Sequence, residues 1–267
     1  MSVPRTVHQE GATLGYREWG DPRGHPLLLH HGLVGGSLSS PLWDELGRRE
    51  GIRVISVERP GYGASPPVPM TAVGDWAPMA RSLLDALDVE HLDVAGVSAG
   101  APYCYALAAR LPERVRGVWV LSGLPYVYDD AVRAHYPDSS LRAWEFYRDA
   151  PLPEVAASFA EAAPRFARTF AGQPTLLGAL EEMAGHGHLG PAREAKLQVR
   201  PWGFALSEVR APVRLWHSPG DDQVPYPAAR ATADLLPDAR LTDQSEPSHF
   251  PSETVVRQLM AELGQRR

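Results

Sequence analysis

Short apolar runs alternate with amphipathic stretches along the first half of the chain, and the alternation returns near its end. Runs rich in aliphatic residues predict strands over 12–19, 27–30, 53–57, 92–97, 115–121, 213–217 and 240–243. Apolar positions at helical spacing predict helices over 73–88, 226–236 and 252–263, and one that ends near residue 111. Strands that alternate with helices in this way indicate βα units that form a largely parallel sheet.

The alternation stops between about Pro125 and Ser207, where no run is typical of a strand. Helical stretches over 141–148, 154–163 and 176–184 are separated there by proline and glycine, which end helices. The pattern predicts a helical cap at residues 125–207, inserted into a core domain formed by residues 1–124 and 208–267. The expected fold class is α/β, with a mostly parallel central sheet flanked by helices.

The pentapeptide Gly96-Val97-Ser98-Ala99-Gly100 lies where a predicted strand meets a predicted helix. A G-x-S-x-G sequence at such a junction is typical of a nucleophile elbow, because the two glycines relieve crowding in a very sharp turn. The turn would expose the Ser98 side chain for reaction. A pattern this short also arises by chance, so the hypothesis depends on suitable partner residues elsewhere in the chain.

Suitable partners follow the predicted cap. Serine is a weak nucleophile and needs a base within hydrogen-bond reach, which an acid in turn orients. Asp221 and Asp222 lie in a loop after the predicted strand 213–217, and His249 lies in a loop before the last helix. The order Ser, Asp, His is the one expected with this type of elbow. The residues alone leave both aspartates open as the acid.

Four separate motifs carry a resemblance to a known family. They are His30-His31-Gly32-Leu33-Val34-Gly35, then Glu58-Arg59-Pro60-Gly61-Tyr62-Gly63-Ala64-Ser65, the elbow, and the acid and histidine loops. With these motifs the chain resembles the α/β-hydrolase superfamily over nearly its whole length. It is most similar to the capped, esterase-like branch, which also contains aminopeptidases, perhydrolases and C–C bond hydrolases. The resemblance implies an α/β-hydrolase fold.

The resemblance also implies residue roles. The family motif places the acid four residues before the proline of a Val-Pro pair, which selects Asp221 over Asp222. It implies that the backbone N–H groups of Leu33 and Ala99 form the oxyanion hole. The chain departs from the family at two positions, with Glu58 in place of the usual Asp and Ser218 in place of the usual Gly. A serine nucleophile disfavours the haloalkane dehalogenases and epoxide hydrolases of the same fold.

The function implied is a serine hydrolase that cleaves an ester, or a related acyl bond, of a small and partly apolar substrate. Ser98 would attack the carbonyl, His249 would accept the serine proton, and Asp221 would orient His249. Water would then release the acid from an acyl-enzyme. The catalytic residues implied are thus Ser98, Asp221 and His249, and no cofactor is required.

Three other functions use the same residues. An aminopeptidase would need cap carboxylates for a free amine, for which the candidates are Glu145, Glu154, Glu161, Glu181 and Glu182. A small residue after the elbow serine, Ala99, argues against it. A C–C bond hydrolase would need an arginine and an aromatic residue near the triad, for which Arg200 and Trp202 are candidates. A receptor that binds a small molecule without turnover is the alternative from another class, and a complete triad argues against it.

Several polar groupings resemble metal sites. His30 and His31 are neighbours in an extended segment, so their side chains diverge and cannot easily share one ion. The spacing of Glu181, Glu182, His186 and His188 fits no zinc pattern, and His217 is better explained as a strand-end residue beside the triad acid. No metal is expected. The cap aromatics Trp144, Phe146, Tyr147, Trp202 and Phe204 are expected mainly to pack, although one or two could line a substrate pocket.

Composition excludes several other classes. The 267 residues carry a formal net charge of −6 without a basic cluster, so nucleic acid is not an expected partner. No apolar run approaches the ~18 residues of a membrane span, and the first 25 residues carry no secretory signal. A single cysteine, Cys104, excludes an intrachain disulfide. We expect a cytoplasmic enzyme with a small-molecule substrate and no membrane partner, and a homo-oligomer remains open.

Overall fold

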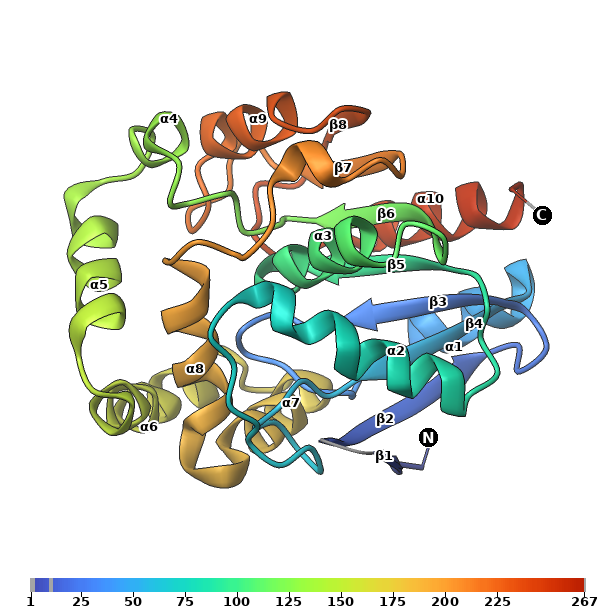
Figure 1. Cartoon of the computed structure of the whole chain (residues 1–267), viewed down its shortest axis with the longest axis horizontal. Helices are drawn as coiled ribbons and strands as arrows, with labels where there is room; N and C mark the ends of the chain where they lie inside the picture. Colours follow the sequence, from blue (N-terminus) through green and yellow to red (C-terminus); the bar gives the residue numbers. More distant parts are fainter. Residues whose placement is uncertain (1–2, 10–11, 267) are drawn as a thin grey trace.

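The computed structural model describes residues 3–9 and 12–266. Within these residues an eight-stranded sheet has the strand order β1-β2-β4-β3-β5-β6-β7-β8 (Figure 1). Strands β1 and β2 pair antiparallel, β2 pairs antiparallel with β4, and the remaining neighbours are parallel. The strands are β1 (Arg5–Gln9), β2 (Ala12–Gly20), β3 (His25–His30), β4 (Ile52–Val57), β5 (Leu92–Val97), β6 (Val115–Leu121), β7 (Val213–His217) and β8 (Ala239–Asp243).

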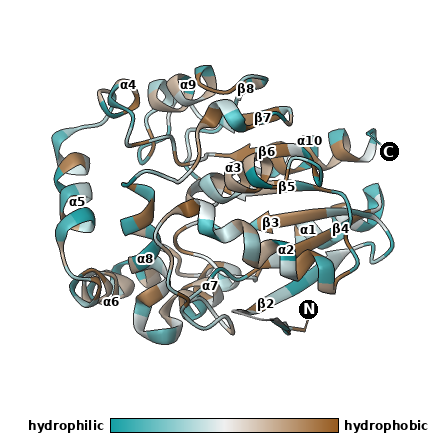
Figure 2. Ribbon diagram, in the orientation of Figure 1, coloured by the Kyte–Doolittle hydropathy of each residue, from teal (hydrophilic) through white to brown (hydrophobic). Residues whose placement is uncertain are grey.

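The central strands are apolar on both faces because helices cover the sheet on both sides. Leu27, Leu28 and Leu29 of β3 are all buried and pair with β4 on one side and β5 on the other. Parallel strands that are buried on both faces read as continuous apolar runs, which is why they stand out in the sequence. Figure 2 shows β3 in the brown of hydrophobic residues along most of its length.

Helices from different parts of the chain cover the two faces. The buried side chains of α2, α3 and α9 join one hydrophobic cluster, and those of α1 and α10 join a second cluster. These helices are α1 (Pro41–Glu50), α2 (Trp76–Ala86), α3 (Ala101–Arg110), α9 (Tyr226–Asp234) and α10 (Glu253–Gly264). A short 3₁₀ helix, η1 (Val73–Asp75), precedes α2, so the helix predicted over 73–88 forms as two pieces.

The chain between β6 and β7 forms helices, and the structure describes no strand there. These helices are α4 (Asp130–Arg133), α5 (Asp138–Asp149), α6 (Leu152–Thr169), α7 (Pro174–Ala184) and α8 (Leu189–Gln198), with 3₁₀ helices η3 (Gly185–His188) and η4 (Leu206–Glu208). Helices α5 to α8 lie beyond the carboxyl ends of the parallel strands (Figure 1). Whether residues 125–207 act as a separate cap stays a prediction.

The elements that were not predicted from the sequence include β1, α1 and α8, as well as the short helix α4. Strand β1 lies at the edge of the sheet, and its residues Arg5-Thr6-Val7-His8-Gln9 are mostly polar, so no apolar run marks it. Helix α1 follows directly on a loop and begins at Pro41. Helix α8 shows little amphipathic pattern because residues around most of its circumference are buried. No helix among the described residues is both long and apolar enough to cross a membrane.

Candidate active site

Ser98 lies in the sharp turn between β5 and α3, in the short 3₁₀ helix η2 (Ser98–Gly100). Its backbone φ is +50°, in the left-handed region that side chains other than glycine rarely adopt. A Cβ atom at Gly96 would lie 2.7 Å from the carbonyl carbon of Gly100, and one at Gly100 would lie 2.5 Å from the His30 carbonyl oxygen. Glycine is therefore required on both sides of the serine, as the elbow hypothesis predicts.

The three residues proposed as a triad meet although they are far apart in the sequence. The Nε2 atom of His249 lies 2.9 Å from Ser98 Oγ. The Nδ1 atom of the same ring lies 2.8 Å from Asp221 Oδ2. Asp221 follows β7 and His249 follows β8, so the loops at the carboxyl ends of three parallel strands supply the three side chains. Such loops are the usual position of sites in open α/β sheets.

Asp221 is held by its own loop as well as by His249. Its Oδ1 accepts hydrogen bonds from the backbone N–H groups of Gln223 at 2.8 Å and Val224 at 2.9 Å. Burial alone would raise the pKa of Asp221, but hydrogen bonds from His217 and His249 outweigh burial and hold that pKa well below its ordinary value. The neighbouring Asp222 is exposed and makes none of these contacts. The acid that faces His249 is therefore Asp221, carried as a carboxylate.

A buried glutamine holds the loop that carries His249. The Nε2 of Gln244 donates to the carbonyl oxygens of Ser248 and Phe250, each at 3.1 Å. Its Oε1 accepts from the backbone N–H of Ser252, also at 3.1 Å. These bonds join the two ends of the loop between β8 and α10. The sequence contains no motif that would have drawn attention to Gln244.

The loop that carries Leu33 lies against the serine. A Cβ atom at Gly32 would be 3.6 Å from Ser98 Cβ, an ordinary contact distance. The Arg59 guanidinium donates to the carbonyl oxygens of His31 at 2.8 Å and Gly32 at 3.3 Å. The ring Nδ1–H of His31 also donates to Gly32 O, at 2.7 Å. The hydroxyl of Tyr62 donates to Leu33 O at 3.0 Å, so three successive carbonyls of this loop have side-chain donors.

Arg59 is fully buried and paired with a carboxylate from the helical segment. Its Nε donates to Glu194 Oε1, and its Nη2 donates to Glu194 Oε2 at 2.9 Å. Burial disfavours the charged guanidinium, but the Glu194 carboxylate outweighs burial and keeps the pKa of Arg59 above its ordinary value. Glu194 lies on α8, far from the motifs, so it could not be associated with the site from its place in the sequence. Only the contact across 135 residues reveals it.

The backbone around Ala99 is fixed from two sides. The Ser98 carbonyl accepts a hydrogen bond from the backbone N–H of Leu124 at 2.9 Å. The Ala99 carbonyl accepts from the Nε2 of Gln198, the last residue of α8, at 3.1 Å. Gln198 is buried and was not a candidate at the sequence level. Helix α8 thus contacts both loops to which the resemblance assigns an oxyanion donor.

Several of the residues that resembled metal ligands have other partners, whereas the buried Nε2 of His188 has none among the described residues. His30 accepts a hydrogen bond from Trp76 Nε1 at 3.0 Å, and burial lowers the pKa of His30 to about 3. Glu182 forms an ion pair with Arg17 and accepts from the backbone N–H of Leu38. His217 donates to the Val224 carbonyl at 2.9 Å and lies beside Asp221. Across residues 3–9 and 12–266, no group of three or more potential ligands could hold a metal ion.

The aromatic residues after β6 mostly pack, as expected. Trp202 is fully buried against Tyr105 and Tyr126. Phe204 also belongs to the core cluster. In the helices beyond the sheet, Trp144 contacts Tyr136 and Tyr147 stacks on Phe159, whereas Phe146 is 39% exposed.

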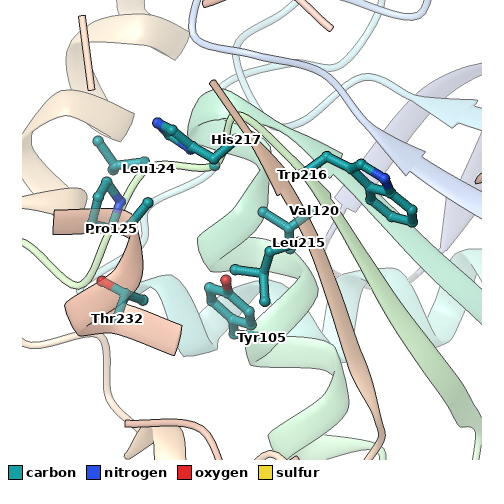
Figure 3. Close-up of a pocket in the computed structure, with 10 residues that line it drawn as sticks. Tyr105, Val120, Leu124, Pro125, Leu215, Trp216, His217 and Thr232 are labelled. Atoms are coloured by element: carbon teal, nitrogen blue, oxygen red, sulfur yellow. The ribbon is translucent and has the colours of Figure 1, made fainter. Parts of the chain in front are cut away.

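A cavity of about 10 Å³ lies beneath the site, between β6, β7, α3 and α9 (Figure 3). Its lining includes Leu124, which bonds the Ser98 carbonyl, and His217, which contacts Asp221. A single water molecule needs roughly 10–15 Å³. The cavity is therefore too small to hold an organic molecule.

Comparisons with known proteins agree with this fold. Residues 25–251 match the family described as the alpha/beta hydrolase fold. An uncharacterized hydrolase of Bacillus subtilis is 30% identical over 45% of this chain, and the match spans only 41% of that relative. A pimeloyl-[acyl-carrier protein] methyl ester esterase of Aromatoleum aromaticum is 29% identical over 84% of this chain and 90% of its own length.

Solved structures show the same fold. The crystal structure of an epoxide hydrolase from Vigna radiata superposes with a TM-score of 0.77, covering 100% of this chain and 98% of that chain. The two sequences are 14% identical, so this likeness concerns the fold alone. The family match over residues 25–251 shows that this chain belongs to the α/β-hydrolase fold family.

Proposed function

We propose that this protein is a serine hydrolase that cleaves esters of small, partly apolar molecules through an acyl-enzyme. The observation that carries the proposal is the unbroken hydrogen-bonded path from Ser98 Oγ through His249 to Asp221. The strained backbone at Ser98 supports it, because strain of this kind persists where the surrounding structure presents a side chain for reaction.

The geometry supports a two-step acyl transfer. Ser98 Oγ attacks the acyl carbon while His249 Nε2 takes the serine proton, and Asp221 stabilises the imidazolium that forms. The N–H groups of Leu33 and Ala99 donate hydrogen bonds that stabilise the negatively charged oxygen of the tetrahedral intermediate. His249 returns its proton to the departing alcohol, which leaves an acyl group on Ser98. Water then attacks the acyl carbon by the same route, releasing the acid and restoring the serine.

Ester hydrolysis is favoured over the other reactions of this family by two observations. The Aromatoleum relative, whose name states that it is a methyl ester esterase, aligns along 90% of its length. The small Ala99 after the nucleophile differs from the large aromatic residue that the aminopeptidase resemblance would imply. Cleavage of amino-acid amides or of C–C bonds in vinylogous diketones is therefore the alternative outcome of the test.

The test is a substrate panel measured with matched serine variants. The wild type, Ser98→Ala and Ser82→Ala are assayed on p-nitrophenyl esters of increasing acyl length, amino-acid p-nitroanilides, lactones and vinylogous diketones. Within the described part of the chain, the Ser82 hydroxyl on α2 bonds only the Pro78 carbonyl, so its variant controls for loss of a hydroxyl. We expect kcat on esters to fall roughly 10⁴-fold or more in Ser98→Ala and to be unchanged in Ser82→Ala. Full ester hydrolysis by Ser98→Ala would contradict the proposal.

A further inference from the structure

We propose that helix α8 positions both oxyanion donors, with Glu194 acting through Arg59 on the Leu33 N–H and Gln198 acting directly on the backbone of Ala99. This inference rests on the proposed function, because it assigns roles in oxyanion stabilisation. Glu194 and Gln198 do not touch the reacting atoms. They are positioning residues.

The direction of the Leu33 N–H follows from what holds the preceding carbonyl. In a trans peptide the C=O and the next N–H lie in one plane and point in opposite directions. The Gly32 carbonyl is held by Arg59 at 3.3 Å and by the His31 ring at 2.7 Å. The Leu33 N–H therefore points away from Arg59. Gly32 lies against Ser98, so the Leu33 N–H is close to the position of a substrate bound on the serine.

Glu194 fixes the arginine on which this orientation depends. Both carboxylate oxygens of Glu194 contact the Arg59 guanidinium, and both side chains are buried. Bidentate pairing of this kind sets the plane of the guanidinium as well as its place. Tyr62 lies between the loop and α8, because its hydroxyl is 3.0 Å from Leu33 O and 3.1 Å from Glu194 Oε2 and its single proton is shared between these two acceptors. The loop is thus connected to α8 through two side chains.

The Ala99 N–H is oriented by the same reasoning. It belongs to the peptide whose carbonyl is that of Ser98, and that carbonyl is held by the Leu124 N–H at 2.9 Å. The following peptide is held through Ala99 O by Gln198 at 3.1 Å. The peptide planes on both sides of the Ala99 Cα are therefore fixed. The Ala99 N–H thus has little freedom to turn away from the substrate.

One rigid element joins the two supports. Glu194 and Gln198 are four residues apart on α8, so they share one face of the helix. A displacement of α8 would move both supports together and would disturb both donors. Because the oxyanion forms only after attack, loss of this positioning lowers kcat more than it raises KM.

The experiment compares a variant of Gln198 on α8 and a variant of Tyr62, which contacts Glu194 of α8, with a control on the same helix. Gln198→Leu removes the donor to Ala99 O, and Tyr62→Phe removes the donor to Leu33 O while keeping the ring. Lys196→Met is the control, because among the described residues Lys196 on α8 bonds only the carbonyls of Tyr147, Arg148 and Ala150. All three are assayed for kcat and KM on the best ester, together with thermal unfolding.

We expect kcat to fall roughly tenfold to hundredfold in Gln198→Leu and in Tyr62→Phe, with KM changed less than about threefold. Lys196→Met should keep wild-type kcat even if its thermal midpoint falls. Wild-type kcat in both test variants, or an equal loss in the control, would overturn the inference. If Gln198→Leu does not fold, Tyr62→Phe decides alone, because the phenyl ring preserves its packing.

A second readout separates this inference from the proposed function. A fluorophosphonate probe reacts at the nucleophilic serine and develops charge on a phosphoryl oxygen, so its labelling rate needs no knowledge of the substrate. Labelling of wild-type Ser98 that slows roughly tenfold or more in both test variants supports the inference. Equal labelling rates overturn the inference and leave the proposed function standing. Failure to label Ser98 in the wild type overturns the proposed function, and the inference with it.

Discussion

Two buried polar clusters lie at the site, and they differ in how they are built. The triad cluster consists of Ser98, Asp221 and His249, all on loops that follow strands of the sheet. The support cluster consists of Arg59, Tyr62 and Glu194, and it joins a core loop to helix α8. In the triad cluster Ser98 Oγ lies 2.9 Å from the Nε2 atom of His249. In the support cluster the described hydrogen bonds hold the side chains to one another and to the carbonyls of the neighbouring loop.

The difference shows which kind of residue leaves a trace in the sequence. A reactive serine needs a sharp turn, and that turn requires Gly96 and Gly100. The two glycines therefore make the serine recognisable in the sequence. A buried carboxylate such as Glu194 needs only to reach its arginine, and any helix at the right distance can supply it. A nucleophile can therefore be recognised from its neighbours in the sequence, whereas a positioning residue such as Glu194 is recognised only from the tertiary structure.

The largest effect should separate the two aspartates of the acid loop. Asp221→Asn should lower kcat by roughly 10³ to 10⁴, because the amide can no longer hold His249 in the required tautomer. Asp222→Asn is the matched control and should be nearly silent, because that side chain is exposed. Steady-state kinetics on one ester would measure both. The reverse ranking would show that the acid has been placed one residue too early.

The support cluster predicts a smaller effect with a different pattern. Glu194→Leu alone should lower the free energy of unfolding by about 3–5 kcal/mol, because it leaves the buried Arg59 charge unpaired. Combining it with Arg59→Met should restore most of that stability. The paired variant should still show reduced kcat, since the Gly32 carbonyl has lost a donor. Urea unfolding and ester kinetics test this together, and full recovery of both quantities would reduce the cluster to a purely structural pair.

The smallest effect concerns pH and a histidine outside both clusters. Burial lowers the pKa of His30 from 6.5 to about 3, so the ring is neutral when folded and takes up a proton on unfolding below pH 6.5. The folded state therefore loses stability as pH falls from 6.5 toward 3. His30→Gln should reduce this slope by about 1.4 kcal/mol per pH unit between pH 4 and 6. Urea unfolding of the wild type, His30→Gln and the control His91→Gln at several pH values measures this slope, because the His91 side chain is exposed. Equal slopes in the three proteins would contradict the assignment of the pH dependence to His30.

The sequence predicted the alternating core because its strands are continuously apolar, as Leu27, Leu28 and Leu29 illustrate. It did not predict β1, whose residues are polar at the sheet edge, or α8, whose buried residues surround the helix and leave no single apolar face. The motifs singled out Ser98, His249 and Asp221, and the structure brings His249 within hydrogen-bond reach of both Ser98 and Asp221. Gln198, Glu194 and Gln244 were missed because each acts on a backbone carbonyl or a distant charge, and neither leaves a motif.

The central claim is that Ser98 carries the acyl group, and trapping the intermediate tests it most directly. Wild-type protein and Ser98→Ala would be mixed with p-nitrophenyl acetate, quenched in acid within the first turnovers, digested and analysed by mass spectrometry. The account predicts one acetyl group on the peptide that contains Ser98 and no acetylated peptide in the variant. Steady hydrolysis by the wild type with the acetyl group on another residue, or equal acetylation in Ser98→Ala, would contradict it.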